Sequence, residues 1–516
     1  MKRRPPRRST GSQYNGPMMS EPDPLPTDIY SAGQVRLIDR VAIDELGIPG
    51  YELMCRAGTA ALAELRKRWP DARRIAVFCG AGNNAGDGYV VARLARAAGL
   101  DVHVVAVVPP ERLRGDAAQA WADCRAAGID AVPFGGPGAA GPLEADVVVD
   151  ALLGTGLDRP VEGAFAEAIA AMNARSVPIL ALDVPSGLDA DTGRVLGVAV
   201  RADATITFVG LKQGLFLGEA PDYRGALAFA DLDIPAVARQ RFRPALTRLS
   251  LRELEAALPK RPRSAHKGTN GRLLLVGGAP GMSGAIRLAA EAALRVGAGL
   301  VYVATHPVSL LPVMSGRPEL MCRAVETADA LDSLLELADA VVLGPGLGRD
   351  AWGRALWQRV IATDLPLVVD ADGLNLLAER STPRGRWIVT PHPAEAGRLL
   401  GIGTAEVQAD RLAAVRELSR KLDAIAVLKG ACSLVCAGEQ VAVCDRGNPG
   451  MATGGTGDVL AGVLGGLAVQ LRDLPTAARV GVLLHALAGD DAARDGERGM
   501  IASDLLAALR RRANPV

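Results

Sequence analysis

The sequence predicts an α/β protein with two domains, each built on a mainly parallel sheet that helices cover on both faces. Its 516 residues exceed one ordinary domain, for which about 150 residues is typical. Short apolar strands alternate with helical segments in both halves of the chain, and a charged, proline-containing stretch separates the halves. Repeated strand–helix–strand units require parallel strands with helices against the sheet. The apolar fraction of 49% is sufficient for two large cores.

The first domain should span residues 28–240, after a basic tail of residues 1–27 that we expect to be disordered. Its expected helices are Gln34–Glu45, Glu52–Trp69, Tyr89–Ala98 and a stretch near Ala164–Met172. Its expected strands are Arg74–Cys79, Val102–Val108, Asp146–Asp150 and Pro178–Leu182. The start codon stays open between Met1, Met18 and Met19.

Residues 241–262 are expected to form a linker, and residues 263–516 a second domain with the same rhythm. A short helical piece is expected at Ser250–Ala257. The expected strands are Arg272–Val276, Leu300–Ala304, Ala340–Leu343, Leu367–Val369, Trp387–Val389 and Ile425–Leu428. A hairpin should follow, from Cys432–Cys436 to Val441–Cys444, with a turn at Gly438 and Glu439.

Composition excludes several classes of function. A net charge of +1 gives no argument for nucleic-acid or membrane partners, and no apolar run reaches the roughly 18 residues of a membrane span. The five histidines lack ligand spacing, which argues against zinc. The seven cysteines contain no CxxC pair, so reduced thiols in a cytoplasmic protein are expected.

The segment Asn448–Asp458 is rich in glycine and threonine and leads directly into an apolar helical run. Such a loop aims backbone N–H groups at one point, and the positive end of the helix dipole adds to them. This is a place to hold a phosphoryl group, and Asp458 could take a proton from an attacking hydroxyl. The second half therefore is predicted to transfer phosphate to a small molecule.

Five more polar or glycine-rich turns follow predicted strands of the second half, where open α/β sheets bind ligands. Each turn alone is explained by tight-turn geometry, and Asp370 could simply cap a helix, but together they predict one site. The turns lie at residues 277–285, 344–348, 370–375, 390–395 and 429–433.

These motifs together resemble the carbohydrate kinase-like dehydratases of NAD(P)H-hydrate repair, a family with the ribokinase-like fold. The resemblance covers roughly residues 250–510 and adds Lys267-Gly-Thr to the turns above. It implies that ADP, or ATP in eukaryotes, phosphorylates the C6 hydroxyl of (S)-NAD(P)HX, after which phosphate leaves and NAD(P)H is restored. The composition is typical of a bacterial chain, so we expect ADP with Mg²⁺.

The resemblance also implies roles for individual residues. Asp458 would activate the substrate hydroxyl as a base. Contacts to the hydrated nicotinamide would come from Ala285, Gly346, His392 and Asp458. The adenine nucleotide would be held by Lys429, Gly430, Ala431, Cys432, Ser433 and Gly457.

In the first half, the segment Gly80–Gly88 follows a predicted strand and could hold a pyrophosphate on its N–H groups. Asp150 and Asp183 end two other strands, and such oxygen donors suit a hard cation. These motifs resemble the NAD(P)HX epimerase domain, which has Rossmann-like topology, over about residues 30–240. The resemblance implies interconversion of (R)- and (S)-NAD(P)HX, with Asp183 as the proton-handling residue and assistance from Lys212.

The implied K⁺ ligands are Asn84, Asp150 and Ser186. The implied substrate contacts are Asn83, Asn84, Ala85, Gly86, Asp87, Gly154, Thr155, Gly156, Leu157, Asp158, Arg159, Pro160 and Asp183. The epimerase family usually has glycine where this chain has Ala85. An alanine there would cost about 1 kcal/mol if the position required a positive φ.

We therefore predict a bifunctional repair enzyme for the small molecules NADHX and NADPHX, expected as a homo-oligomer. One alternative is a vitamin-precursor or sugar kinase with a non-catalytic first domain. Another is a binding module without turnover, since domains like the first one also occur without catalysis. No residue separates NADHX from NADPHX preference, and none shows whether the two sites are coupled.

Overall fold

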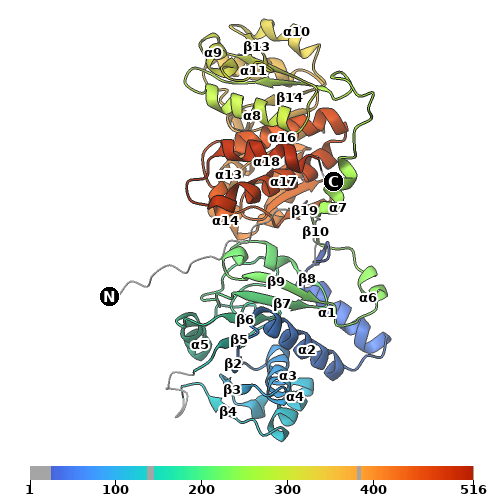
Figure 1. Ribbon diagram of the computed structural model, residues 1–516, viewed down its shortest axis with the longest axis vertical. Coiled ribbons are helices and arrows are strands. Elements are labelled where there is room, and N and C mark those ends of the chain that lie inside the picture. Colours follow the sequence, from blue (N-terminus) through green and yellow to red (C-terminus); the bar gives the residue numbers. More distant parts are fainter. Residues whose placement is uncertain (1–24, 136–143, 380–384, 515–516) are drawn as a thin grey trace, which may run out of the picture.

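The computed structural model describes residues 25–135, 144–379 and 385–514 and has two α/β lobes stacked along the long axis (Figure 1). The lobes correspond to the two halves of the sequence. Both contain a largely parallel sheet between layers of helices, as the alternation of strands and helices predicted.

The N-terminal lobe has a seven-stranded sheet in the order β4-β3-β2-β5-β6-β7-β9, with every neighbouring pair parallel. Its strands are β2 (Arg74–Cys79), β3 (Asp101–Ala106), β4 (Ala131–Pro133), β5 (Val147–Ala151), β6 (Ile179–Leu182), β7 (Ala204–Phe208) and β9 (Ala226–Ala230). Its helices are α1 (Ala32–Arg40) with a π-helix at Val41–Glu45, α2 (Gly50–Arg68), α3 (Asn83–Ala97), α4 (Gly115–Ala126), α5 (Gly163–Asn173) and α6 (Ala236–Gln240).

Two hydrophobic cores flank this sheet and make three layers. Val77 and Val149 face the core formed with α2, α3 and α4. Phe78 and Val148, each adjacent in sequence to one of these residues, face the core formed with α5. This alternation follows from the two-residue period of a strand, and it confirms the expected three-layer arrangement.

The C-terminal lobe belongs to a twelve-stranded sheet in the order β13-β12-β11-β14-β15-β16-β17-β18-β19-β10-β1-β8. The strands of the lobe are β11 (Arg272–Val276), β12 (Leu300–Thr305), β13 (Met321–Ala324), β14 (Ala340–Leu343), β15 (Leu367–Val369), β16 (Trp387–Val389), β17 (Ile425–Leu428), β18 (Ser433–Ala437) and β19 (Gln440–Cys444). The predicted hairpin is present as β18 and β19, which pair antiparallel around Gly438 and Glu439.

Helices cover both faces of this second sheet. One core contains residues of α8 (Ser283–Arg295), α16 (Thr456–Leu471), α17 (Leu474–Ala492) and α18 (Ala502–Arg512). The other contains residues of α11 (Ala351–Ile361), α12 (Asp372–Glu379), α13 (Pro393–Leu400), α14 (Thr404–Ala409) and α15 (Arg411–Leu422). The remaining helices are α7 (Leu251–Ala257), α9 (Leu310–Met314) and α10 (Asp332–Leu335).

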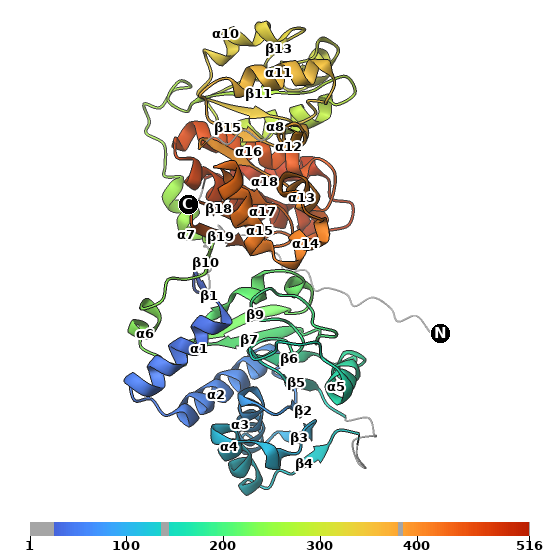
Figure 2. The same cartoon turned by 180° about the vertical axis from the view of Figure 1, so that it is seen from behind.

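Three very short strands connect the lobes: β1 (Asp28–Tyr30), β10 (Leu246–Arg248) and β8 (Leu211–Lys212). Figure 2 shows β1 and β10 from behind, between the two lobes. β10 pairs with β19 on one side and with β1 on the other, and β1 also pairs with β8. The segment expected to be a linker therefore contributes a strand to a sheet that continues from one lobe into the other. Strands this short carry no periodic signal, which is why the sequence did not predict them.

Among the helices that the structure describes, none is long and apolar enough to cross a membrane.

Candidate active sites

The first site is a cavity of about 830 Å³ at the carboxyl ends of β2, β5 and β6. In an open parallel sheet this edge is where loops from several strands converge on a ligand. Most of the predicted substrate contacts line the cavity: Asn83, Asn84, Asp87, Gly154, Thr155, Gly156, Leu157, Asp158, Arg159, Pro160 and Asp183.

The segment Asn83–Asp87 forms the first turn and a half of α3 rather than a loop before it. Ala85 and Gly86 are buried there and do not line the cavity, unlike their neighbours. Ala85 does not have a positive φ, so the alanine carries no backbone cost. A Cβ at Gly86 would lie 2.6 Å from the Met54 side chain, so glycine allows α3 to pack closely on α2.

The three predicted K⁺ ligands are Asn84, which lines the cavity, and Asp150 and Ser186, which do not. The Asp150 carboxylate is fully buried and accepts hydrogen bonds from the Ser186 amide at 2.8 Å and from its hydroxyl at 2.6 Å. Asn84 donates to the Leu153 carbonyl at 2.9 Å, and its own side-chain oxygen is buried without a partner among the described residues. A buried carboxylate beside an unpaired amide oxygen fits an oxygen-ligated cation such as K⁺.

Asp183 follows β6 in the left-handed backbone region, with φ of 64°. That conformation costs a non-glycine residue of order 1 kcal/mol or more and is common where a side chain must be aimed at a site. The carboxylate forms an ion pair with Lys212 of β8. The ammonium group, which is almost fully buried, also donates to the Phe208 carbonyl at 2.7 Å and to the Thr207 hydroxyl at 3.1 Å.

Two further carboxyl groups surround Lys212, and one of them was not predicted. Burial, reinforced by the charges of Asp183 and Asp39, raises the pKa of Asp87 well above its usual range. Burial also raises the pKa of Asp39 in α1 to about 6, although the Lys212 charge opposes this shift. No sequence motif surrounds Asp39, so the sequence did not predict it as a site residue. Its place in the cavity wall follows from the packing of α1.

The second site begins at the start of α16, where Asp458 lies in the first turn, after Gly455 with φ of 95°. Burial, together with the negative charge of Asp370, raises the pKa of Asp458 to about 7, while Lys429 opposes the shift. A carboxyl group with a pKa near 7 is suited to accept a proton at neutral pH. The predicted base thus lies where the helix N-terminus is open to an anion.

Lys429 lies at the centre of this site. Its ammonium group is 2.7 Å from the Asp370 carboxylate and 3.9 Å from that of Glu395. Burial alone would lower the pKa of Lys429, but the charges of Asp370 and Glu395 outweigh burial and raise it. Asp370 is itself buried and accepts a hydrogen bond from Thr390 at 2.7 Å. The lysine is therefore held as a fixed cation beside Asp458.

The rest of the predicted nucleotide segment forms a tight turn after β17. Gly430 has φ of 137° and Cys432 has φ of 52°, and Ser433 donates to the Gly430 carbonyl at 3.0 Å. The Cys432 side chain is buried, so this residue can reach a ligand only through its backbone. A Cβ at Gly457 would lie 3.4 Å from the Lys429 ammonium, which places this turn next to the start of α16.

Besides Asp458, three residues were predicted to contact the nicotinamide: Ala285, Gly346 and His392. Gly346 and Ala285 are adjacent, since a Cβ at Gly346 would lie 3.4 Å from that of Ala285. His392 caps α13: its Nδ1 accepts from the Ala394 amide at 3.1 Å. The other ring nitrogen lies 3.5 Å from Glu395, which links His392 to the Lys429 cluster.

One histidine near this site was missed by the sequence analysis. His485 of α17 is buried, and its Nε2 lies 3.0 Å from the carbonyl oxygen of Thr456, the first residue of α16. Burial lowers the pKa of His485 to about 4, so the ring is neutral at physiological pH. His485 thus contacts the first residue of α16, and only the tertiary packing of α17 against α16 creates this contact.

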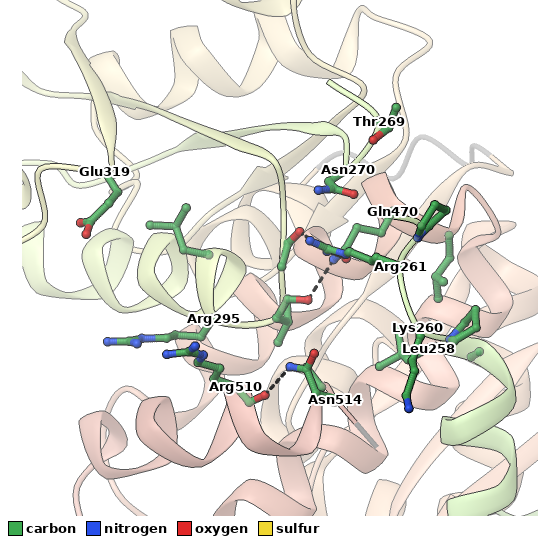
Figure 3. Close-up of a pocket in the computed structure, with 18 of the residues that line it drawn as sticks. Leu258, Lys260, Arg261, Thr269, Asn270, Arg295, Glu319, Gln470, Arg510 and Asn514 are labelled. Carbon is green, nitrogen blue, oxygen red and sulfur yellow. Dashed lines mark hydrogen bonds between the residues drawn. The ribbon is translucent and has the colours of Figure 1, made fainter. Parts of the chain in front are cut away.

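A separate cavity of about 920 Å³ lies at the opposite end of α16 (Figure 3). Gln470 lines it, twelve residues after Asp458, so roughly 18 Å separates the two along the helix axis. Arg295 and Arg510 lie near the C-terminal ends of α8 and α18, where cations favour the helix dipole. Arg261 donates to the Gly297 carbonyl at 2.6 Å. The positions of these arginines follow from the C-terminal ends of helices, which favour cations. None of the predicted site residues lines this cavity.

The fold and the two sites together define a two-domain α/β enzyme, with a cavity lined by carboxyl groups in a Rossmann-like domain and a buried carboxyl group at a helix start in a ribokinase-like domain. A family model described as NAD(P)H-hydrate dehydratase matches residues 273–511, and one described as YjeF-related protein N-terminus matches residues 50–214. The chain belongs to the family of bifunctional NAD(P)H-hydrate repair enzymes.

Two relatives show this membership over nearly the full length. The repair enzyme of Coxiella burnetii is 49% identical, covering 95% of this chain and 100% of the relative. That of Escherichia coli is 44% identical over 96% of both chains. A solved ribokinase-like superfamily protein from Enterococcus faecalis covers 53% of this chain and 96% of its own, with 30% identity and a TM-score of 0.50.

Proposed function

We propose that this protein repairs hydrated nicotinamide cofactors with two activities, one in each domain. The C-terminal domain dehydrates (S)-NAD(P)HX at the expense of ADP, giving NAD(P)H, AMP and phosphate. The N-terminal domain interconverts (R)- and (S)-NAD(P)HX, so that both epimers reach the dehydratase. The single observation that carries the proposal is the position of Asp458, with its raised pKa, at the start of α16 beside Lys429.

For the dehydratase, Asp458 would remove the proton of the C6 hydroxyl while the N-terminus of α16 holds the transferred phosphoryl group. Lys429, fixed by Asp370, supplies positive charge where negative charge develops. Phosphorylation turns a poor leaving group into a good one, and the ring nitrogen then expels phosphate. Mg²⁺ would arrive on the nucleotide phosphates, which normally supply most of its ligands.

For the epimerase, Asp183 would be the proton-handling residue in the interconversion at C6, with Lys212 fixing its position. K⁺ bound by Asn84, Asp150 and Ser186 would order the loop after β5 that lines the cavity.

We also propose a cytoplasmic location, because all seven cysteines are free thiols. A homo-oligomer stays a prediction.

The test is recovery of the reduced-nicotinamide absorbance from a mixed pool of both NADHX epimers with ADP, Mg²⁺ and K⁺. We expect full recovery by the unchanged protein, none above the spontaneous rate with Asp458→Asn, and recovery of only the S fraction with Asp183→Asn. Recovery of only the S fraction by the unchanged protein would contradict the epimerase assignment. No recovery with ADP or ATP would contradict the repair function altogether.

A further inference from the structure

One face of α1 forms a wall of the N-terminal cavity. Arg36 and Asp39 of α1 line it three residues apart, the spacing of one helical face, and Ile43 of the following π-helix lines it as well. The Arg36 guanidinium donates to the Thr155 carbonyl at 3.2 Å, which ties this face to the loop after β5. The helix continues directly after Arg40 as a π-helix, an uncommon element that occurs frequently at functional sites.

Asp39 is the carboxyl group of this wall, and it has no hydrogen bond or ion pair within the part of the chain that the structure describes. Lys212 cannot supply one, because its three N–H groups are already directed at Asp183, Thr207 and Phe208. Carboxyl groups that stabilise a fold are normally paired when buried. An unpaired, partly buried carboxyl group that faces a cavity is instead available to a ligand.

We propose that Asp39 is the second acid–base group of the epimerase site and works with Asp183 on the same C6 hydroxyl. The inference rests on the epimerase activity proposed above. Epimerisation at C6 requires one group that gives a proton to the departing oxygen and one that takes a proton from the incoming water. Because burial raises the pKa of Asp39 to about 6, this group keeps part of its proton near neutral pH, while Asp183 forms an ion pair with Lys212.

The step balances as follows. Protonated Asp39 donates its proton to the C6 hydroxyl, the C6–O bond breaks with both electrons on oxygen, and water departs as the N1 lone pair forms a C=N bond. Water then adds to the opposite face of C6, the π electrons return to N1, and Asp183 accepts the surplus proton. One proton has moved from Asp39 to Asp183, and exchange with solvent restores the starting state. In the opposite direction the two carboxyl groups exchange roles.

Any pH profile of this site reflects several groups that face Asp39 from other elements. Lys212 comes from β8, Asp183 from the end of β6, Asp87 from α3 and Asp116 from α4. The remaining charged groups that line the cavity are Arg36, Asp158, Arg159 and Glu162. The test therefore compares matched variants rather than reading one profile in isolation.

The experiment follows conversion of pure (R)-NADHX to the S epimer without ADP, in the full-length protein, for Asp39→Asn, Asp39→Glu and Asp44→Asn. Asp44 lies on the π-helix that follows Asp39, but it is exposed and does not line the cavity. We expect Asp39→Asn to slow conversion by about 100-fold or more and to remove the fall in rate as pH rises through about 6. Asp39→Glu should recover part of the rate, and Asp44→Asn should match the unchanged protein.

The dehydratase rate on (S)-NADHX, measured on each variant, reports whether the chain is folded. Conversion by Asp39→Asn at the unchanged rate and with the unchanged pH profile would overturn the inference. A slower rate with the same pH profile in both Asp39 variants would also overturn it, because it would show a structural role. If the unchanged protein does not interconvert the epimers at all, the proposed epimerase function fails and the inference with it.

Discussion

At the scale of single residues, Asp458 shows how charge and burial set the working pH of a site. Its carboxyl group must be deprotonated to act as a base, and its pKa is raised to about 7. Dehydratase kcat should therefore be low below pH 6 and rise as pH increases through about 7. Burial raises the pKa of Asp458 most, and the charge of Asp370 raises it next. The second cause can be tested by removing that charge.

We expect Asp370→Asn to move this rise toward lower pH by about one unit, because a neighbouring negative charge is removed. Asp372→Asn should move it in the same direction by less, since the Asp372 charge raises the pKa of Asp458 more weakly. The measurement is kcat against pH with saturating substrate. An unchanged profile in Asp370→Asn would show that this charge does not tune the base.

At the scale of elements, the glycines of α16 have two different purposes. A Cβ at Gly457 would lie 3.4 Å from the Lys429 ammonium and 3.7 Å from the Asp370 carboxylate, inside the site. A Cβ at Gly462 would lie 1.9 Å from the Ala289 carbonyl, inside the packing of α16 on α8. The first glycine leaves room for a ligand, and the second allows two helices to approach.

Gly457→Ala should leave the melting temperature unchanged or slightly higher, because alanine is about 1 kcal/mol better than glycine within a helix. It should nevertheless reduce dehydratase activity by about tenfold or more, since the methyl group narrows the space for phosphate. Gly462→Ala should instead lower the melting temperature. Full activity in Gly457→Ala would contradict the placement of the phosphoryl group at the start of α16.

At the scale of the whole molecule, the two domains share one sheet through β10 and β1. Arg248 of β10 is fully buried at this junction. Its guanidinium donates to the Leu25 carbonyl at 2.8 Å and lies 3.6 Å from the Asp445 carboxylate, which follows β19. A single side chain thus connects the segment before β1 with the C-terminal domain.

Arg248→Met should lower the free energy of unfolding by about 3–5 kcal/mol, because the buried Asp445 carboxylate would lose its fully buried partner and keep only the partly exposed Arg446 at 3.8 Å. Arg243→Met provides the matched control on the same segment, since Arg243 forms an exposed ion pair with Glu439 and should contribute at most about 1 kcal/mol. Urea unfolding of both variants measures the difference. Equal stability of the two variants would show that the junction does not hold the domains together.

The sequence predicted four helices of the first domain and most strands of both sheets, because their apolar patterns are local. It gave no bounds for α4 or for the long helices of the second domain, and it did not predict β4 and β13. It missed β7 and β9, whose residues include alanine and threonine rather than a run of large apolar side chains, and the very short strands β1, β8 and β10. It also placed the start of α3 at Tyr89, whereas the helix begins at Asn83, because the glycines there suggest a loop. In α3 they serve close packing instead.

By itself, the sequence determined the α/β class, the two domains and the strand-end motifs that carry Asp150, Asp183 and Asp458, because these features depend on periodicity and on neighbours along the chain. Only the tertiary structure brought Asp39 to the cavity that Asp183 and Lys212 line, and His485 to the start of α16. The sharing of one sheet between domains also depends on it. These features arise from contacts between residues far apart in the sequence, and the pKa values follow from the burial that those contacts create.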